Sequence, residues 1–257
     1  MTRIASWNVN SVKARLEHLQ RWLKESSPDI VLLQELKCID EAFPRLEIEA
    51  LGYNVAVVGQ KTYNGVAILS KFPIDIELTA LPGNDADEQA RYLEVFTGSV
   101  RVACIYLPNG NPIPGEKFDY KLKWMQRLYH HVQELLKGEE AFVLGGDYNV
   151  IPQEGDVYNA QAFANDALFQ PESRAALRKI INLGLTDAYR ATTSETGQYT
   201  WWGYMAGGWQ KDHGVRIDHL LLSPQATDRL KNCDIDRTPR SWGKPSDHTP
   251  IWCELED

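Results

Sequence analysis

The order of apolar runs along the chain limits its possible folds more than any other feature. A strand, a helix and a strand open the first half, hairpins follow, and the same order returns in the second half. Ile30–Leu33 is a continuous apolar run, as expected for a strand buried on both faces. Predicted hairpins join Tyr53–Val58 to Val66–Ser70 and Tyr92–Phe96 to Val100–Tyr106. The pattern predicts an α/β fold in which two mixed β-sheets pack face to face with helices outside.

Two segments have the periodicity of amphipathic helices. The first runs from about Val12 to Glu25 with Ser11 as its cap, and the second runs from about Glu116 to Lys137. A third helix is expected near Ser173–Leu183. The outer face of the second helix carries four basic residues, Lys117, Lys121, Lys123 and Arg127. Such a face is either a solvated surface or a contact region for phosphates.

Length and composition predict one domain. The chain has 257 residues, 43% of them hydrophobic, and no Ser/Gly/Pro-rich linker divides it. We therefore expect residues 1–257 to form a single domain. The first predicted strand begins within three residues of Met1, which leaves no room for a leader peptide, and no apolar run reaches membrane-spanning length. These features predict a cytoplasmic protein without a membrane partner.

Charge and cysteine content restrict the possible functions. The net charge of −8 argues against a nucleic-acid coat protein, which is normally basic. It does not exclude a nuclease, because carboxylates that hold divalent cations present positive charge locally to a phosphate. The four cysteines form no C-x-x-C pair, so a thiolate zinc site is disfavoured and a reducing compartment is expected.

Polar side chains stand at the ends of at least five predicted strands. Any one of them has an ordinary explanation, and the Asp247-His248 pair alone is more typical of a turn. In α/β sheets, however, ligands bind in the crevice beyond the strand ends. We therefore predict that one cluster gathers the polar residues Asn8, Glu35, Tyr106, Asp147, Asn149, Asp218, Asp247 and His248.

The oxygen-rich cluster predicts metal-assisted phosphodiester hydrolysis. Oxygen ligands suit Mg²⁺ or Mn²⁺, and the chain has neither an H-E-x-x-H motif nor a nucleotide-binding P-loop. Asp147 could take a proton from the attacking water while Asn149 fixes the geometry. A metal on Glu35 could stabilise the phosphoryl oxygen and the leaving group, and His248 could donate a hydrogen bond there. Tyr106 could assist the leaving group, and which acid orients His248 stays open.

Short motifs in a fixed order make the chain similar to a known family. The resemblance is to the exonuclease III group of apurinic/apyrimidinic endonucleases, in the endonuclease/exonuclease/phosphatase superfamily. Its matching segments are Trp7-Asn8-Val9-Asn10-Ser11 with Arg15, Leu33-Gln34-Glu35-Leu36-Lys37, Tyr63-Asn64-Gly65-Val66-Ala67-Ile68-Leu69-Ser70, Tyr106-Leu107-Pro108-Asn109-Gly110, Lys117-Phe118 through Lys121 to Trp124, Gly146-Asp147-Tyr148-Asn149-Val150, Leu185-Thr186-Asp187-Ala188-Tyr189-Arg190, Tyr199-Thr200-Trp201-Trp202, Arg216-Ile217-Asp218 and Ser246-Asp247-His248.

The resemblance implies an architecture and a set of roles. It implies a four-layer α/β sandwich and a catalytic set in which Asp147 is the general base, Asn149 a stabiliser, Tyr106 part of the site, and His248 supported by Asp218. A Mg²⁺ or Mn²⁺ ion would be held by Glu35 with nearby groups. The full set of predicted metal-site residues is Asn8, Glu35, Asp147, Asn149, Asp247 and His248.

The resemblance also implies a substrate. The expected substrate is double-stranded DNA with an abasic site, cut on the 5′ side of the lesion, with accompanying 3′–5′ exonuclease and cleaning of blocked 3′ ends. Arg91 and Lys121 could bind phosphates. A pocket for the extruded sugar is predicted from four loop residues, Trp201, Trp202, Trp209 and Val215. Core packing is the competing interpretation for one of the first two tryptophans.

Two other functions stay open. One is a superfamily hydrolase that acts on phosphoinositides, sphingomyelin or RNA. The other is a nucleic-acid-binding regulator that has kept the fold and lost activity, which the filled catalytic positions disfavour. We expect a monomer that acts at the nucleoid of a bacterial-type cytoplasm.

Overall fold

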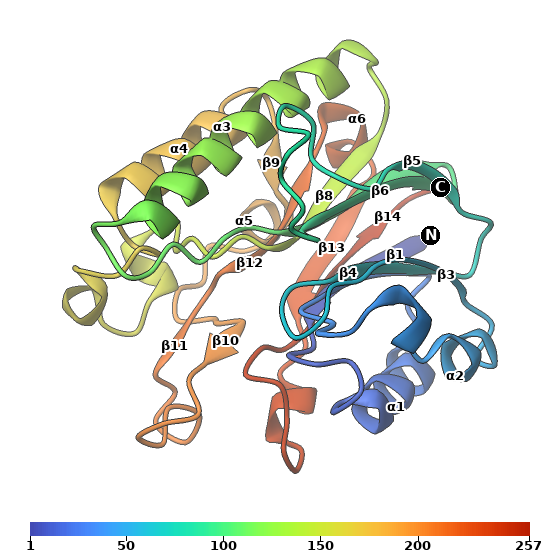
Figure 1. The fold of residues 1–257 in the computed structure, drawn as a ribbon, viewed down its shortest axis with the longest axis horizontal. Coiled ribbons are helices and arrows are strands. Elements are labelled where there is room, and N and C mark those ends of the chain that lie inside the picture. The colour runs from blue at the N-terminus through green and yellow to red at the C-terminus, as the bar shows by residue number, and fades with distance from the viewer.

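Two six-stranded β-sheets form the centre of the molecule, which the computed structural model describes over residues 1–257 (Figure 1). In spatial order, sheet A contains β13 (Leu230–Ile235), β14 (Ile251–Leu255), β1 (Thr2–Asn8), β2 (Ile30–Gln34), β4 (Val66–Ser70) and β3 (Asn54–Val58). Sheet B contains β5 (Asp75–Leu78), β6 (Tyr92–Thr97), β7 (Val100–Tyr106), β8 (Phe142–Asp147), β12 (Asp218–Leu222) and β9 (Thr186–Asp187). A separate two-stranded ribbon pairs β10 (Trp201–Trp202) with β11 (Gly214–Val215).

Both large sheets are mixed, as predicted. In sheet A, β1 runs parallel to β2, and in sheet B, β7 runs parallel to β8. The remaining neighbours within the two sheets pair antiparallel. These include both predicted hairpins, β3 with β4 and β6 with β7. The hairpin predictions are therefore confirmed.

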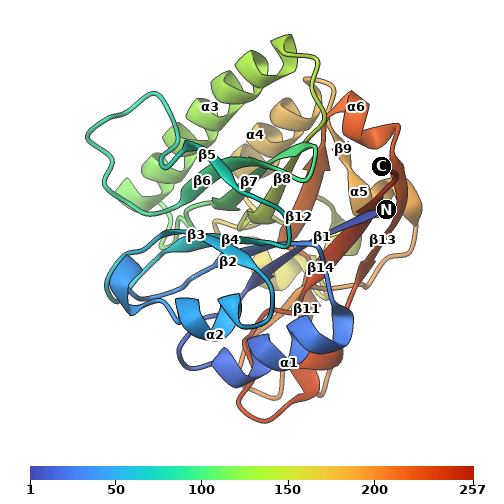
Figure 2. The ribbon, with the colours of Figure 1, turned by 90° about the vertical axis from the view of Figure 1, so that its right-hand side faces the viewer.

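Helices cover the outer faces of the sheets and complete four layers (Figures 1 and 2). The α-helices are α1 (Leu16–Ser26), α2 (Arg45–Glu49), α3 (Glu116–Lys137), α4 (Pro171–Ile181), α5 (Ala188–Thr192) and α6 (Pro224–Thr227). The 3₁₀-helices are η1 (Asp40–Ala42), η2 (Glu154–Asp156), η3 (Ala160–Phe163) and η4 (Thr238–Ser241). Buried side chains of α1 and α2 pack on sheet A, and those of α3 and α4 pack on sheet B. The predicted α/β sandwich is confirmed.

Strand β2 shows why the sequence could predict this layering. Leu32 packs into the core between the two sheets, whereas Val31 and Leu33 pack into the core beneath α1 and α2. All three side chains are fully buried. A strand with an apolar layer on each face needs an unbroken apolar run, and this is the pattern of Ile30–Leu33.

Gly145 lets the two sheets approach closely. A Cβ atom at this position would lie 2.5 Å from Leu32 Cδ1 of sheet A and 2.7 Å from Leu220 Cδ2 of β12. The next residue, Gly146, is tighter still, because its Cβ would lie 1.8 Å from the carbonyl oxygen of Ile105. Because neither glycine has a side chain, β8 lies close to sheet A and to its neighbouring strands, and Asp147, the residue after Gly146, ends this strand.

Helix α1 begins later than the sequence predicts. Its first residue is Leu16, and Ser11 makes no capping bond to it. The Ser11 and Val12 backbone N–H groups instead donate to the carbonyl oxygens of Glu35 and Leu36, at 2.8 and 3.2 Å. Because these donors are satisfied by the loop after β2, the chain follows that loop before the helix starts. The apolar face is as predicted, with Leu19, Trp22 and Leu23 buried.

The other predicted helices lie close to their expected bounds. Helix α3 spans Glu116–Lys137 as predicted, and α4 begins at Pro171, two residues before the predicted start. Its first turn favours proline, which has no N–H to leave unpaired. Residues 153–172 and 194–215, two long segments between the predicted helices and strands, contain η2, η3 and the β10–β11 ribbon. None of the helices combines the length and apolar composition that crossing a bilayer requires.

The close approach of the sheets at Gly145 is testable by substitution. We expect Gly145→Ala to lower the free energy of unfolding by about 1–3 kcal/mol, because its methyl group would overlap Leu32 and Leu220. Gly243→Ala is the matched control, since a Cβ there meets no atom within 4 Å. Its stability should be unchanged or raised by less than about 1 kcal/mol. Urea titrations measure both values, and equal stability of the two variants would contradict the close packing.

Candidate active site

Polar strand ends from both sheets meet at one edge of the sandwich. In sheet A, Asn8 ends β1 and Glu35 directly follows the parallel strand β2. In sheet B, Asp147 ends β8 opposite Asp218, the first residue of the antiparallel strand β12. His248 lies three residues before β14, which starts beside the end of β1. Segments from the whole length of the chain thus converge here, as the cluster hypothesis expected.

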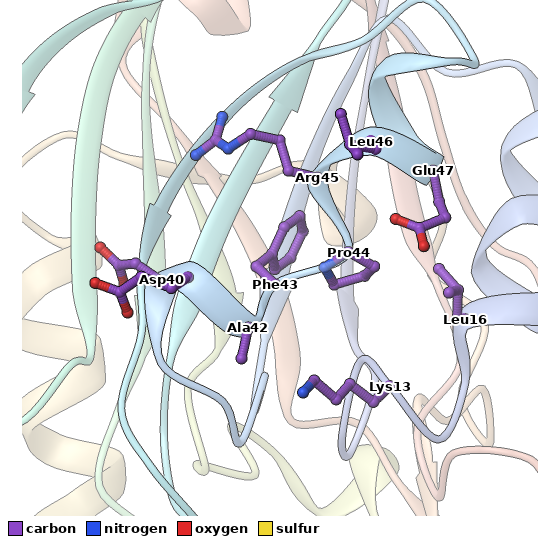
Figure 3. Close-up of a pocket in the computed structure, with 10 residues that line it drawn as sticks. Lys13, Leu16, Asp40, Ala42, Phe43, Pro44, Arg45, Leu46 and Glu47 are labelled. Atoms are coloured by element: carbon purple, nitrogen blue, oxygen red, sulfur yellow. The ribbon is translucent and has the colours of Figure 1, made fainter.

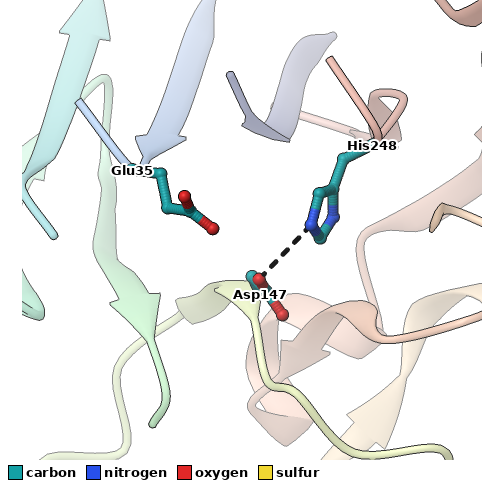
Figure 4. A group of neighbouring side chains, drawn as sticks. All are labelled: Glu35, Asp147 and His248. Carbon is teal, nitrogen blue, oxygen red and sulfur yellow. Dashed lines mark ion pairs between the residues drawn. The ribbon is translucent and has the colours of Figure 1, made fainter. Parts of the chain in front are cut away.

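Asp147 lies between Glu35 and His248 (Figure 4). One ligand atom from each of the three side chains lies within 4.8 Å of the other two. His248 Nε2 is 3.6 Å from Asp147 Oδ2. Two carboxylates and an imidazole at this spacing can hold a divalent cation, and the carboxylate oxygens suit a hard ion.

Asp218 is the acid that orients His248. Its Oδ2 lies 2.8 Å from His248 Nδ1, and both side chains are buried. Burial alone would lower the pKa of the His248 imidazole, but the carboxylates of Asp218 and Asp147 raise it to about 10. The ring is therefore an imidazolium at neutral pH and can donate a hydrogen bond from Nε2.

Asp147 has the properties of a general base. Burial raises the pKa of its carboxyl to about 7, and the negative charge of Asp218 adds to the shift while His248 opposes it. Its Oδ1 accepts the Asn149 backbone N–H at 2.9 Å, and its Oδ2 accepts from the Asn8 amide at 3.0 Å. A base with a pKa near the working pH is the most effective one for proton transfer.

Asn8 bridges the two carboxylates. Its Nδ2 donates to Glu35 Oε1 at 2.9 Å and to Asp147 Oδ2 at 3.0 Å. Its Oδ1 accepts the backbone N–H of Asn10 at 3.0 Å. The amide therefore holds the acids in place with its nitrogen, and its oxygen is already engaged.

Glu35 is held by a local backbone turn and a cation. Its φ of 54° lies in the left-handed region, as does the φ of 56° at Lys37. Lys37 Nζ lies 3.0 Å from Glu35 Oε2. Burial alone would raise the pKa of the Glu35 carboxyl, but the Asn8 hydrogen bond and the Lys37 charge lower it. Glu35 is thus ionised at neutral pH and available to a cation.

The remaining predicted site residues surround this centre. Both carboxylate oxygens of Asp247 accept hydrogen bonds, from Trp201 Nε1 and from Asn10 Nδ2, each at 3.0 Å. The Asn149 amide donates to the Leu107 carbonyl at 2.9 Å and accepts from Asn109 at 3.1 Å. Both side chains are therefore engaged by protein groups beside the Glu35–Asp147 pair.

Tyr106 closes the sheet B side of the site. It ends β7 beside Asp147, and the Arg91 guanidinium carbon lies 4.8 Å from its ring centroid. Burial and the charges of Glu35 and Asp147 raise the pKa of the phenol well above its ordinary value. The phenol therefore keeps its proton and can act as a donor.

A pocket of about 280 Å³ opens over the cluster. Its apolar wall is formed by Phe163, Leu168, Trp201 and Ile217. The sequence prediction included only Trp201 of these four. Phe163 and Leu168 belong to the segment 153–172, whose length and content of aromatic residues and glycine are the only sequence signals for them. Asn109 and Asp166 also line the pocket and were missed, although Asn109 lies within the Tyr106–Gly110 motif.

Three residues predicted for the pocket do not line it. Trp202 is fully buried and packs edge to face on Trp209 at 4.8 Å, which confirms the core interpretation for this tryptophan. Trp209 belongs to that aromatic contact instead of the pocket wall. Val215 is fully buried in the apolar cluster behind Ile217. Adjacent sequence positions point in opposite directions on the ribbon, so only Trp201 of the pair faces the site.

The two predicted phosphate-binding residues differ in position. Arg91 lines a groove of about 310 Å³ beside the pocket, together with Lys117 and Asn109. Lys121 is fully buried, so the prediction that it binds phosphate or lies on a solvated face is wrong. Its amine donates to the backbone carbonyls of Asn109 and Asn149. Helix α3 turns this residue inward because Trp124, Met125 and Leu128 bury the same face.

A larger hollow lies elsewhere in the molecule. It has a volume of about 610 Å³ and lies where α1, η1 and α2 meet on the outer side of sheet A (Figure 3). Apolar side chains such as Phe43 and Leu46 line it together with charged groups of both signs, including Lys13 and Asp40. It contains no histidine or cysteine, and the Glu35, Asp147 and His248 group that could hold a metal lies in the smaller pocket.

Known nucleases are similar to this chain in sequence and in structure. Residues 5–248 match the endonuclease/exonuclease/phosphatase family. Exodeoxyribonuclease III of Haemophilus influenzae is 32% identical over 266 residues, covering 99% of this chain and 100% of that protein. An AP endonuclease from Archaeoglobus fulgidus has a TM-score of 0.96 at 35% identity, with both chains fully covered. The Neisseria 3′ phosphatase NExo, solved with a product DNA hairpin, has a TM-score of 0.97 at 34% identity, also with full coverage.

The chain belongs to the endonuclease/exonuclease/phosphatase family. The predicted resemblance to the exonuclease III group is confirmed, and the protein is a hydrolytic nuclease. Nucleases of this family depend on a metal, and the cluster of Glu35, Asp147 and His248 can hold one.

The charge state of His248 provides a test of the site. In the metal-free protein, NMR of the imidazole nitrogens should show His248 protonated at pH 8 and losing its proton near pH 10. His18 provides an internal contrast, because burial and nearby Arg15 lower its pKa below 6.5. Asp218→Asn should lower the His248 pKa by at least about one unit, since it removes the adjacent negative charge. Titration of wild-type His248 near pH 6.5 would contradict the assigned ion pair.

Proposed function

We propose that the protein is a DNA-repair phosphodiesterase that cuts duplex DNA on the 5′ side of abasic sites. We further propose 3′–5′ exonuclease activity and removal of blocking groups from 3′ ends. The observation that carries the proposal is the position of Asp147 between Glu35 and the His248–Asp218 pair. The names of its relatives support the substrate, since they include an exodeoxyribonuclease, an AP endonuclease and a 3′ phosphatase.

The reaction is hydrolysis of a P–O bond. Asp147 takes a proton from water, the water oxygen bonds to phosphorus, and the bond from phosphorus to the upstream 3′ oxygen breaks. The Asn149 backbone N–H and the Asn8 amide hold the Asp147 carboxylate in place. The imidazolium of His248 donates to the phosphoryl oxygen on which negative charge develops. Tyr106 donates a proton or a hydrogen bond to the departing oxygen.

We propose that Glu35 and Asp147 hold the metal ion, with Mg²⁺ or Mn²⁺ as the ion. Their oxygens are hard ligands on adjacent carboxylates, which suits both cations. When bound there, the ion supplies Lewis-acid stabilisation of the phosphoryl oxygen. Asn8, Asn149 and Asp247 act mainly through the hydrogen bonds that hold this centre. His248 Nε2 faces the same space and serves as a donor while it carries its proton.

The apolar wall of the pocket supports recognition of an extruded abasic sugar. Phe163, Leu168, Trp201 and Ile217 offer a largely apolar surface next to the reacting carboxylates, and the one polar side-chain group among them, Trp201 Nε1, is engaged with Asp247. A deoxyribose without its base is small and leaves the helix at low cost, because no stacking or pairing must be broken. Arg91, in the neighbouring groove, is placed to contact a flanking phosphate.

Three broader expectations complete the proposal. We propose that residues 1–257 act as one endonuclease/exonuclease/phosphatase domain and that the protein is a monomer. The substrate partner is duplex DNA with abasic sites or blocked 3′ ends. The similarity to bacterial exodeoxyribonucleases supports a cytoplasmic location with action at the nucleoid.

A competition assay tests the proposed substrate. At equal concentrations and with Mg²⁺, the protein should cleave a duplex with one abasic site faster than intact duplex, RNA, inositol phosphates or sphingomyelin. A chelator should stop the reaction, and Asp147→Asn should reduce turnover by about 10²–10⁴-fold, because the general base is lost. DNA binding by this variant, measured by fluorescence anisotropy, should persist.

Equal rates on abasic and intact duplex would refute abasic specificity. Faster cleavage of RNA, inositol phosphates or sphingomyelin would favour another hydrolase of the same superfamily. DNA binding without cleavage of any substrate would favour the regulator hypothesis.

A further inference from the structure

Lys121 is a buried cation next to the active site, with no acidic partner in contact. Its side chain is fully buried, and its amine donates to backbone carbonyl oxygens and to no carboxylate. Burial lowers the pKa of its amine to about 7, although the charges of Asp147 and Asp166 oppose the shift. A buried amine without a paired carboxylate opposes folding unless its hydrogens are satisfied. A lysine in this place therefore needs an explanation other than stability.

The hydrogen bonds of Lys121 join two loops of the active site. Its Nζ donates to the Asn109 carbonyl at 3.0 Å and also to the Asn149 carbonyl. Asn109 lies in the loop after β7, and Asn149 lies in the loop after β8. The side chains of these two asparagines bond each other at 3.1 Å and both line the pocket. The amine therefore holds the backbone of Asn109 and Asn149, the two residues whose side chains bond to each other.

The same arrangement reaches the general base. The Asn149 backbone N–H donates to Asp147 Oδ1 at 2.9 Å, so a shift of Asn149 moves the hydrogen bond that holds the base. Asn149 adopts a left-handed φ of 47°, a conformation that an asparagine tolerates but that costs energy without support. Lys121 contacts the carbonyl oxygen of this same residue and supplies such support.

The fold makes room for the lysine. Gly110 has a φ of 92°, and a Cβ there would lie 2.7 Å from Lys121 Cδ and 3.1 Å from the Ala167 methyl carbon. The loop after β7 therefore passes directly over the lysine stem. The stem has no open path to the groove that Arg91 lines, so the amine cannot reach a substrate phosphate without displacing this loop.

We propose that Lys121 is a positioning residue that holds Asn109 and Asn149 in the geometry needed for the reaction. It acts through its two carbonyl contacts and does not touch the substrate. This inference rests on the proposed function, because Asn149 matters only if Asp147 is the base. It assigns Lys121 a role in turnover and none in DNA affinity.

The test compares Lys121→Met with Lys123→Met, an exposed position on the same helix. Methionine keeps the length and apolar stem of lysine and removes the amine. For Lys121→Met we expect kcat to fall by about tenfold or more, because a misplaced catalytic group is costly, with KM within about twofold of wild type. Its Tm should stay close to that of wild type, since removal of a buried amine favours folding while two carbonyl oxygens lose their donor. Lys123→Met should match wild type in all three quantities.

Salt dependence separates positioning from phosphate binding. The slope of log affinity against log salt should be the same for Lys121→Met and wild type. A residue that contacts phosphate would reduce the magnitude of this slope by about one on removal. A reduced slope with raised KM and unchanged kcat would overturn the proposal, and so would an unchanged kcat alone.

Asn109→Ala covers the case in which Lys121→Met fails to fold. It removes the side-chain bond to Asn149 and leaves the lysine in place. We expect kcat to fall here as well, and the double variant should be no slower than the slower single variant, since both act through Asn149. Wild-type kcat in Asn109→Ala, or additive losses in the double variant, would refute the proposal. Inactive wild-type protein on every DNA substrate would refute the proposed function instead.

Discussion

The active site depends on close contact between the two sheets. Glu35 and His248 are carried by sheet A, while Asp147 and Asp218 are carried by sheet B. The carboxylates and imidazole come within 4.8 Å at an edge where Gly145 places no side chain between the layers and Gly146 lets β8 lie close to the Ile105 backbone of β7. The apolar core between the sheets stabilises this contact, and the strand ends at its edge hold the charged groups.

The buried charges at this edge give Asp218 and Asp147 different relations to His248. Asp218 pairs with His248 and keeps the imidazole protonated, whereas Asp147 faces the ring at a longer distance and has a raised pKa. In the mechanism we propose, the two acids beside one histidine have different functions, one as an orienting partner and one as a base. Asn8 links the base to Glu35, which Lys37 keeps ionised. A cation at this position would neutralise repulsion between Glu35 and Asp147 that the protein groups only partly offset.

The sequence predicted features that depend on local or periodic patterns. Apolar runs such as Ile30–Leu33 revealed buried strands, and the polar residue after each run located the site. Features that depend on distant contacts were missed. Helix α1 starts late because Val12 bonds to Leu36, and Lys121 is buried because the loop of Gly110 covers it. The pocket wall was only partly predicted, since Phe163 and Leu168 come from an irregular segment whose path is set by tertiary contacts.

The central claim is that side chains from both sheets share one divalent ion. Crystals soaked in Mn²⁺ and measured at the manganese absorption edge test it directly. The account predicts one anomalous peak at about 2.0–2.3 Å from carboxylate oxygens of both Glu35 and Asp147. A peak bound to only one of these residues, or a peak only at another part of the molecule, would contradict it.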